Sequence, residues 1–420
     1  MTPANRLVTA GFIATAVTFG PARMGYGLFL AAFRKAFVLS TTVTGLIASG
    51  GFLAFLVALL ASAWFARHHG ERLPVVTGAL LASAGFVAVA AAWAPWVLAL
   101  GIALAGAAAG LCWAPFNDAA ERVLPDTARA GALSVISTGT SAGVIVAAGL
   151  GLAVTQTALN WRAAWIFFAL CGIGLAVVAR KGMPTSSRGA KPARDALAEI
   201  VQASLPGDLG PDPGPNAGAP GPSLLQRAAL PLYLTAICFG MTNAVFLSFA
   251  ADRVVVAGGL PGLPDAAASA VIFFAYGFCG VLGLAAGRIE ARFGLAPLFC
   301  GIFGAGALSL ILIALAPTSW GAVLVASGLH GIAIMTVSAV LSFWSLRLFP
   351  GRGTVGFTAT LLSMAAGSVV GPAVAGVLAA SLGPAAMFLI ASVPPLAMAL
   401  WFGSKLRLPR PRLPPVPEIF

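Results

Sequence analysis

Twelve apolar stretches follow one another along the chain, and each is about as long as a membrane-spanning helix. Such a helix needs about 20 mostly apolar residues to cross the hydrocarbon core. The stretches lie at roughly 7–30, 43–66, 73–93, 96–117, 131–154, 161–180, 229–251, 267–287, 296–316, 319–346, 354–380 and 384–404. Within lipid, a helix satisfies its own backbone hydrogen bonds. The sequence therefore predicts an all-α membrane protein with twelve transmembrane helices.

Too few charged residues are present to cover a water-facing surface. Only 9% of the 420 residues are charged and the mean hydropathy is +0.97, whereas soluble domains carry about 25% charged residues. This argues against a soluble enzyme, a disordered protein and a nucleic-acid-binding domain, although the net charge is +12. The five cysteines lie singly inside apolar stretches, and none forms a C-x-x-C pair. Neither a metal site nor a cofactor is expected.

The positions of the basic residues indicate the orientation. If the N-terminus is cytoplasmic, the inside segments hold 19 of the 24 Lys and Arg residues and the outside segments hold 4, with Arg23 inside a span. Cytoplasmic segments of membrane proteins are enriched in Lys and Arg. We therefore expect a multi-pass protein of the cell inner membrane with both termini in the cytoplasm.

One break between the apolar stretches is long. It runs from 184 to 228 and is rich in Pro and Gly, above all at 207–215. This composition is typical of a flexible linker. The expected domains are an N-terminal six-helix bundle (1–183), a cytoplasmic linker (184–228), a C-terminal six-helix bundle (229–404) and a cytoplasmic tail (405–420).

The two halves contain matching residues at a nearly constant offset. Ala94-Pro95 recurs as Ala316-Pro317, and Ala142-Gly143 recurs as Ala366-Gly367. An even number of spans in each half gives both halves the same orientation in the membrane. The repeat predicts two pseudo-symmetric bundles related by an axis along the membrane normal.

The loops after the second span of each half point to a family. They read AWFARHHGER at 63–72 and GRIEARFG at 287–294. Together with the arrangement of six spans, linker and six spans, they resemble the Gly-x-x-x-Asp-Arg-x-Gly-Arg-Arg loop of the major facilitator superfamily. Arg67 and Ala291 stand where the family has an acid. The resemblance implies two bundles that expose one central cavity to each side in turn, with Arg67 and Arg292 as candidate gating residues.

Arg23 is the clearest candidate for a binding residue. It lies near the middle of the first span, where a charge costs about 2.5–3.5 kcal/mol on insertion scales. Pro21, two residues earlier, removes a helix hydrogen bond. A cation here would bind an anionic group of a substrate, with Tyr26 beside it as a second candidate. Alternatively, Arg23 bonds to helix carbonyls or extends to the membrane surface.

Four further side chains are candidates for substrate binding. Asn243, Tyr276 and His330 lie at mid-depth in the seventh, eighth and tenth spans, and Trp113 lies near the end of the fourth. The polar groups could bond to a substrate, but they equally fit hydrogen bonds between helices. His330 could also carry a proton, because imidazole titrates near neutral pH.

The end of the fourth span carries a polar pair. Asn117 and Asp118 have no counterpart around Ser342 in the second half, and they are candidates for gating or proton coupling. An ion pair of Asp118 with Arg122 at the membrane surface is the alternative. No Asp or Glu lies at mid-membrane. If protons drive this protein, His330 or Asp118 must carry them.

The expected function is secondary transport of a small organic molecule by alternating access. The substrate would be an organic anion or a hydrophobic drug-like compound, and protons are a candidate coupling ion. The expected partners are this small molecule and the lipid bilayer, not nucleic acid, and we expect a monomer. The alternatives are a transporter-like sensor and an intramembrane serine hydrolase. The hydrolase would use Ser141 in the G-x-S-x-G run 139–143, although small residues in mid-helix are typical of helix packing.

Overall fold

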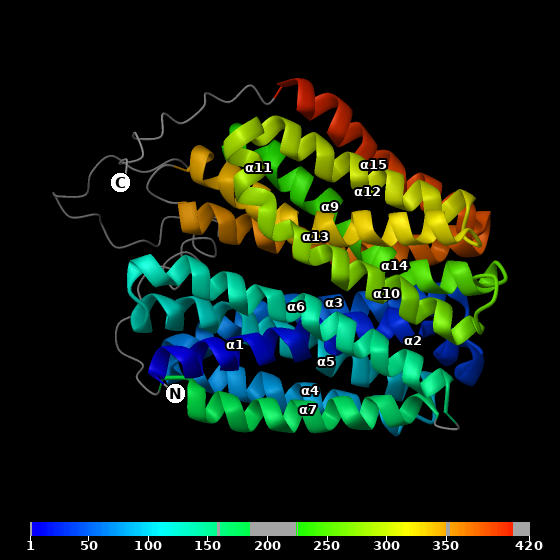
Figure 1. Cartoon of the computed structure of the whole chain (residues 1–420), viewed down its shortest axis with the longest axis horizontal. Helices are drawn as coiled ribbons and strands as arrows, with labels where there is room; N and C mark the ends of the chain where they lie inside the picture. Colours follow the sequence, from blue (N-terminus) through cyan, green and yellow to red (C-terminus); the bar gives the residue numbers. More distant parts are fainter. Residues whose placement is uncertain (1, 158–159, 185–223, 225, 350–352, 406–420) are drawn as a thin grey trace, which may run out of the picture.

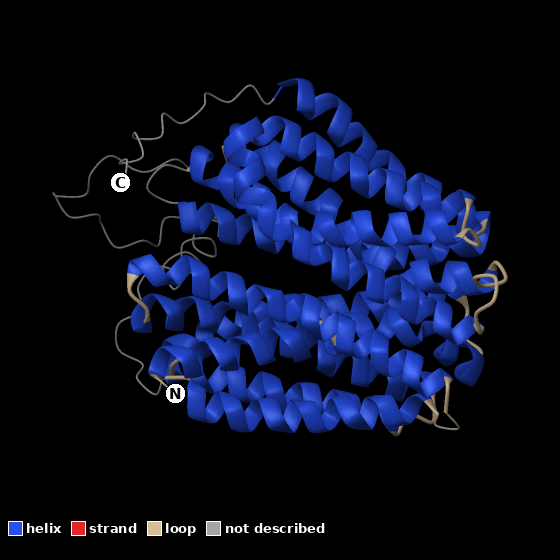
Figure 2. Cartoon of the chain, viewed as in Figure 1, coloured by secondary structure: helices blue, strands red, loops and turns tan. Residues whose placement is uncertain are grey.

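A computed structural model describes the chain except residues 1, 158–159, 185–223, 225, 350–352 and 406–420. The described residues form helices and short loops and contain no strand (Figure 2). In this part of the chain, ten helical segments are long and apolar enough to cross a membrane. Two shorter apolar helices, Ala267–Gly283 and Pro384–Leu400, stand in the places of the eighth and twelfth predicted spans. The all-α membrane fold is confirmed, while the count of twelve stays a prediction.

The N-terminal bundle contains the helices α1 to α7. Their bounds are α1 Pro3–Phe19, α2 Pro21–Phe37, α3 Thr41–His69, α4 Arg72–Ala90, α5 Pro95–Val123, α6 Asp126–Thr155 and α7 Trp161–Gly182. Proline occupies the first turn of α1, α2 and α5, where its missing N–H costs no helix hydrogen bond. Asn160 caps α7 by accepting a hydrogen bond from the Arg162 N–H at 2.9 Å.

The C-terminal bundle contains the remaining helices. Their bounds are η1 Arg227–Ala229, α9 Leu230–Val256, α10 Asp265–Gly280, η2 Val281–Ala285, α11 Ala286–Phe293, α12 Leu295–Leu315, α13 Trp320–Leu348, α14 Gly353–Leu382 and α15 Pro384–Lys405. Most of the predicted linker, and the tail beyond Lys405, lie outside the described residues.

Two predicted spans are not continuous helices. The first, predicted at 7–30, extends to Phe37 and consists of α1 and α2 with a break at Gly20. The eighth, predicted at 267–287, changes from α10 into the 3₁₀ segment η2 and then into α11. Gly283 lies in η2 and packs tightly against Met335 of α13. Its low helix propensity and this close contact are consistent with the change of helix type.

The same helix pairs pack together in both bundles. The pairs α1–α6, α3–α5 and α4–α7 in the first bundle correspond to α9–α14, α10–α13 and α12–α15 in the second. This correspondence follows the order of the spans, as expected for two copies of one fold. The bundles lie side by side (Figure 1) and meet along α2–α9, α3–α14 and α6–α10.

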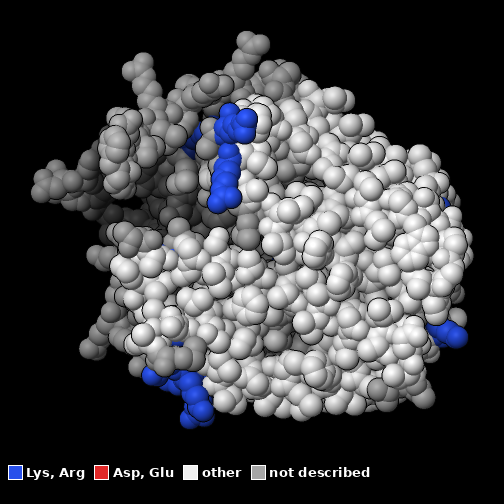
Figure 3. All heavy atoms as spheres, viewed as in Figure 1, with Lys and Arg blue, Asp and Glu red and all other residues white. Residues whose placement is uncertain are grey.

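The two ends of the molecule differ in how the bundles meet. The start of α1 and the end of α15 lie at one end, here called the terminal end, and the other is called the opposite end (Figure 1). Close backbone contacts join the bundles near the opposite end, where Gly45 meets the Pro372 carbonyl and Gly376 meets Thr41. At the terminal end, the surface is hollowed between the bundles (Figure 3).

The outer surface is that of a protein in lipid. Large apolar side chains such as Leu170 and Leu400 are 61% and 71% exposed, and in water a surface of this kind would drive association. In the face drawn in Figure 3, Lys and Arg lie at the two ends and the broad middle carries no charged residue. The charge-free band therefore fits the hydrocarbon region of a bilayer.

Candidate functional site

The first membrane segment breaks where its glycine and proline meet. α1 ends at Phe19, Gly20 has φ −76° and ψ −103°, and α2 begins at Pro21. Because Pro21 has no N–H, the carbonyl one turn earlier loses its donor. Gly20 lies against the backbone of Gly143 on α6, and a side chain at Gly20 would have no room. The break therefore positions α2, and with it Arg23, separately from α1.

The guanidinium of Arg23 lies among aromatic rings. Its central carbon is 4.6 Å from the ring centre of Phe55, 5.3 Å from that of Phe52 and 5.6 Å from that of Phe19. Such cation–π contacts stabilise a cation but leave its charge in place. No hydrogen bond or ion pair joins Arg23 to another described residue. Its N–H donors are therefore available to a bound anion.

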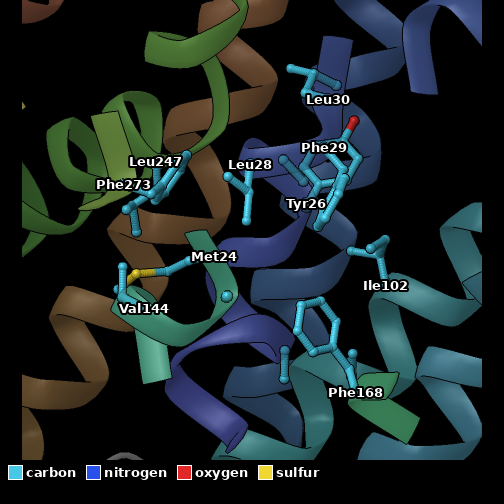
Figure 4. Packing of buried hydrophobic residues seen from close by; sticks show 14 of the residues in the cluster. Met24, Tyr26, Leu28, Phe29, Leu30, Ile102, Val144, Phe168, Leu247 and Phe273 are labelled. Atoms are coloured by element: carbon cyan, nitrogen blue, oxygen red, sulfur yellow. The ribbon is translucent and has the colours of Figure 1, made fainter. Parts of the chain in front are cut away.

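Arg23 borders a small cavity between the two bundles. Residues of α2, α3 and α5 line it from the first bundle, and Leu247 and Ser248 of α9 line it from the second. Its free volume of about 20 Å³ holds about one water molecule. Figure 4 shows Leu247 and Phe273 of the second bundle beside Leu28 of α2. The conformation therefore leaves no space for an organic molecule beside Arg23.

The backbones of α2 and α9 touch one turn after Arg23. A side-chain carbon at Gly27 would collide with the Leu247 carbonyl and approach Phe273 to 3.2 Å. Only glycine permits this contact between the bundles. The crossing holds the cavity closed on the side toward the opposite end.

Two of the predicted binding residues lie near this cavity in the first bundle. Tyr26 lines it, and its hydroxyl donates a hydrogen bond to the Thr44 carbonyl at 2.8 Å. Trp113 packs edge to face against Phe19, with 5.4 Å between the ring centres. Trp113 thus contacts the aromatic group around Arg23, and the Tyr26 hydroxyl already has an acceptor.

The other predicted binding residues, Asn243, Tyr276 and His330, are buried in the second bundle. His330 and Phe246 stack with 4.1 Å between ring centres and 9° between planes, and Tyr276 lies 6.2 Å from Phe246. In the described part of the chain, no partner bonds to the Tyr276 hydroxyl, either ring nitrogen of His330 or the Asn243 Oδ1. Buried polar atoms are nearly always hydrogen-bonded in native proteins.

Of the predicted gating residues, the side chains of only Arg292 and His330 are described. The side chains of Arg67, Asn117 and Asp118 lie outside the described residues. Arg292 is exposed on α11 and lies over the neighbouring Phe293 ring, with 5.4 Å between the guanidinium carbon and the ring centre. His330, by contrast, is 1% exposed. Arg292 and His330 therefore belong to separate regions of the second bundle.

An ion pair that the sequence analysis does not predict joins the bundles at the opposite end. Nη1 of Arg34 on α2 lies 2.6 Å from Oδ2 of Asp252 on α9, and the two side chains are 26% and 9% exposed. Arg34 follows the first predicted span (7–30) and Asp252 follows the seventh (229–251), in regions where charges are common. Their separation along the chain is close to the offset between Ala94 and Ala316. Because this separation is close to the repeat offset, Arg34 and Asp252 occupy nearly equivalent positions in the two halves. The sequence could have indicated from this that they are neighbours across the pseudo-symmetry axis.

A second ion pair lies within the C-terminal bundle. Nη2 of Arg347 on α13 is 2.6 Å from Oε1 of Glu290 on α11. Glu290 directly precedes Ala291, which stands at the acid position of the loop described above. An acid displaced by one residue therefore links this loop to α13.

Ser141 lies in a helix interface. It is 2% exposed, and its backbone carbonyl faces Gly277 of α10. On the other side of α6, Gly139 and Gly143 pack against the backbone of α1. The G-x-S-x-G run therefore serves as a small-residue surface that packs α6 against two helices.

The comparisons with known proteins agree on one fold. A family model described as the Major Facilitator Superfamily matches residues 10–351, while no curated protein matches the sequence significantly. A mutant of the nucleoside transporter NupG is similar with a TM-score of 0.76 and 12% identity, covering 97% of this chain and 100% of that chain. A POT family transporter in complex with 5-aminolevulinic acid has a TM-score of 0.72 and 14% identity, with 96% of both chains covered. A bacterial homolog of the human lysosomal transporter Spinster, inward-facing and occupied, has a TM-score of 0.70 and 15% identity, covering 96% of this chain and 98% of that chain.

Proposed function

The chain belongs to the major facilitator superfamily, and we propose that it is a secondary transporter that moves a small organic anion or a hydrophobic drug-like compound by alternating access. The observation that carries this proposal is Arg23. It lies at a helix break, beside a cavity between the bundles and without a hydrogen-bond or ion-pair partner among the described residues. An unpaired cation inside a membrane protein can bind the anionic group of a substrate reversibly.

The surroundings of Arg23 suit an anion with an apolar body. Phe19, Phe52 and Phe55 around the guanidinium and Trp113 beside Phe19 offer aromatic surface. In the second bundle, the unpartnered polar atoms of Asn243, Tyr276 and His330 offer neutral hydrogen-bonding groups. A substrate between the bundles would contact both sets, and a few well-placed polar groups in an apolar pocket are typical of small-molecule sites.

The conformation supports a mechanism in which the two ends open in turn. The helix crossing at Gly27 and the Arg34–Asp252 pair hold the opposite end closed, and the surface is hollowed at the terminal end. A substrate would enter from the terminal end after the bundles shift enough to enlarge the cavity. Separation of the opposite end would then release it there, or the cycle would run in reverse.

Protons are the coupling ion that we propose, with His330 as their carrier. Its two ring nitrogens are buried and unpartnered, so they can accept a proton only when water reaches them. We also propose the inner membrane as the location, with both termini and the terminal end facing the cytoplasm, and a monomeric state. Uptake into vesicles with and without a pH gradient tests the coupling, because a transporter driven by protons loses accumulation when the gradient is removed.

The test of the proposed function is transport by purified protein in lipid vesicles. A thermal-shift screen of organic acids and antibiotics selects the compounds, and their uptake is then compared between wild type, Arg23→Ala, Arg23→Lys and the exposed control Arg288→Gln. A hydrogen bond to a charged group contributes about 1.5–3 kcal/mol, so Arg23→Ala should lower kcat/KM for an anion by about 10- to 150-fold.

The control and the conservative variant make this result specific. Arg23→Lys should retain part of the activity, since it keeps the charge but loses the fork of N–H donors, and Arg288→Gln should transport like wild type. Unchanged anion transport by a folded Arg23→Ala protein would refute the role of Arg23. A complete lack of transport by wild type across the panel would count against the function itself.

A further inference from the structure

A second cavity lies away from the central site, at the terminal end of the N-terminal bundle. It has a volume of about 860 Å³ and is lined by four basic side chains: Arg6 of α1, Arg72 of α4, and Arg180 and Lys181 of α7. No acidic residue is among the described residues that line it. Glu71, the sequence neighbour of Arg72, is 3% exposed and does not line the cavity.

The N-terminus of α1 adds to the positive potential of this cavity. Pro3 in the first turn of α1 and Arg72 in the first turn of α4 line it. The first turn of α1 contains no acid and its N-cap is Thr2, so the partial positive charge at that helix start is not offset there. At the start of α4, the N-cap residue is Glu71. At Gly182, α7 passes close to the backbone of Arg6, which brings the cations of α1 and α7 together. The cavity is therefore suited to an anionic group.

An apolar stripe leads along α7 into the same cavity. Ile166, Leu170, Ile173 and Val177 recur at helical spacing on one face, and they are 55%, 61%, 50% and 49% exposed. Residues spaced by three and four share one side of a helix. Val177 lines the cavity itself, and Lys181 follows it one turn later. The stripe thus ends where the cations begin.

We propose that this cavity binds the headgroup of an anionic phospholipid, with an acyl chain along the exposed stripe of α7. The chemistry that is recognised is a phosphate group. The continuity of an apolar stripe with a basic cavity favours a lipid over a free phosphate ion, because a free ion makes no use of the stripe. Basic cavities between helices at the membrane surface bind lipid headgroups in this way. Figure 3 shows Lys and Arg gathered at this corner of the N-terminal bundle.

A simpler explanation exists for two of the cations. Arg180 and Lys181 lie in the last turn of α7, where a positive charge stabilises the helix end. That role does not explain Arg72, which lies in the first turn of α4. Helix stabilisation also makes a different prediction. It affects the thermal stability of the protein, whereas a lipid site affects the preference between headgroups.

The test is lipid binding by the full-length protein in detergent, measured by native mass spectrometry. Dioleoyl phosphatidylglycerol and dioleoyl phosphatidylcholine have the same acyl chains but differ in headgroup charge. The variants are Arg180→Gln/Lys181→Gln, the separate variant Arg72→Gln, and the charge-conserving Arg180→Lys/Lys181→Arg. The matched control is Arg227→Gln/Arg288→Gln, which removes two exposed cations from the other bundle.

We expect wild type and the control to prefer phosphatidylglycerol. Each lost cation should weaken its binding by about fivefold, so the Arg180→Gln/Lys181→Gln protein should lose about 25-fold and Arg72→Gln about fivefold. The charge-conserving variant should keep the preference. Melting curves identify any variant that fails to fold, and Arg72→Gln tests the proposal independently of α7.

Two results would overturn the proposal. One is equal binding of the two lipids by wild type, or a preference that survives in both the α7 and the Arg72 variants. The other is a thermal shift with millimolar inorganic phosphate that depends on these cations while phosphatidylglycerol does not compete for the site. The second result would assign the cavity to a free anion. Neither depends on transport, so the lipid site and the transport function are tested separately.

Discussion

The Arg34–Asp252 ion pair should control how the opposite end opens. The pair joins α2 to α9 and therefore exists only while the two bundles are in contact there. Asp252→Asn removes the charge while keeping nearly the same side-chain volume, so it tests the pair without creating a cavity. Any effect on the balance of conformations then reports the ion pair itself.

The size of the effect follows from the distance and burial of the pair. At 2.6 Å, with Asp252 9% exposed, this is a charged hydrogen bond of the kind that contributes about 1.5–3 kcal/mol. Arg34 is 26% exposed, and solvent screening places the expected value in the lower half of that range. About 1.5–2 kcal/mol changes the ratio of closed to open populations by about 10- to 30-fold.

The assay is a distance measurement between spin labels at the opposite end. Labels are placed at Ala36 and Val256, which are exposed near the ends of α2 and α9, in a protein whose five native cysteines are replaced. Pulsed electron paramagnetic resonance then gives the populations of short and long distances. Asp252→Asn and Arg34→Gln should both raise the long-distance population. The exchanged pair Arg34→Asp/Asp252→Arg should restore the short one.

A matched control exists within one bundle. Arg347 and Glu290 form an ion pair at the same distance of 2.6 Å, but both lie in the C-terminal bundle. Arg347→Gln should therefore leave the label distances unchanged. The reasoning is refuted if Asp252→Asn and Arg34→Gln leave the distances at wild-type values, or if Arg347→Gln shifts them equally.

Three further substitutions, one of them with a matched control, test the packing. Gly27→Val places carbon where the Leu247 carbonyl lies and should separate the labels further than Asp252→Asn does, whereas Gly174→Val, at a glycine with open space around it, should leave them in place. Trp165→Ala removes a 0% exposed indole and should cost about 3–5 kcal/mol of stability, which is measured as a lower thermal unfolding midpoint. Pro21→Ala restores a helix donor at the break between α1 and α2 and should lower the transport rate while raising the unfolding midpoint; a wild-type rate would show that the break has no role in transport.

Much of the fold can be predicted from the sequence because lipid imposes a simple requirement. Each span must be apolar over about 20 residues and helical, so hydropathy alone locates most helices. The near-constant repeat offset predicts the corresponding helix pairs. The interruption at Gly283 could not be predicted with the same tools, since glycines occur throughout the apolar spans and the Gly283 contact with Met335 of α13 joins two distant helices. A contact between distant helices leaves no periodic pattern in either of them.

The central site was predictable only in part. Arg23 stands out because a cation is rare in an apolar span. Phe52 and Phe55, which surround it, resemble every other apolar residue in their span. Arg34 and Asp252 lie near span ends, where charged residues are expected, so their residue types do not indicate that they pair. Their pairing depends on how two distant helices meet in space.

The two bundles share their helix packing but differ in the residues at equivalent positions. Asn243 follows Pro21 by the same offset at which Ala316 follows Ala94. At Pro21 the helix is broken and a cation follows, whereas α9 runs without a break from Leu230 to Val256 through Asn243. The shared helix pairs give the two bundles the same internal packing. The residues that differ make the space between them chemically unequal, with a charged side in the first bundle and a neutral polar side in the second. Under the proposed function, a substrate between them would therefore be oriented, with its anionic group toward α2.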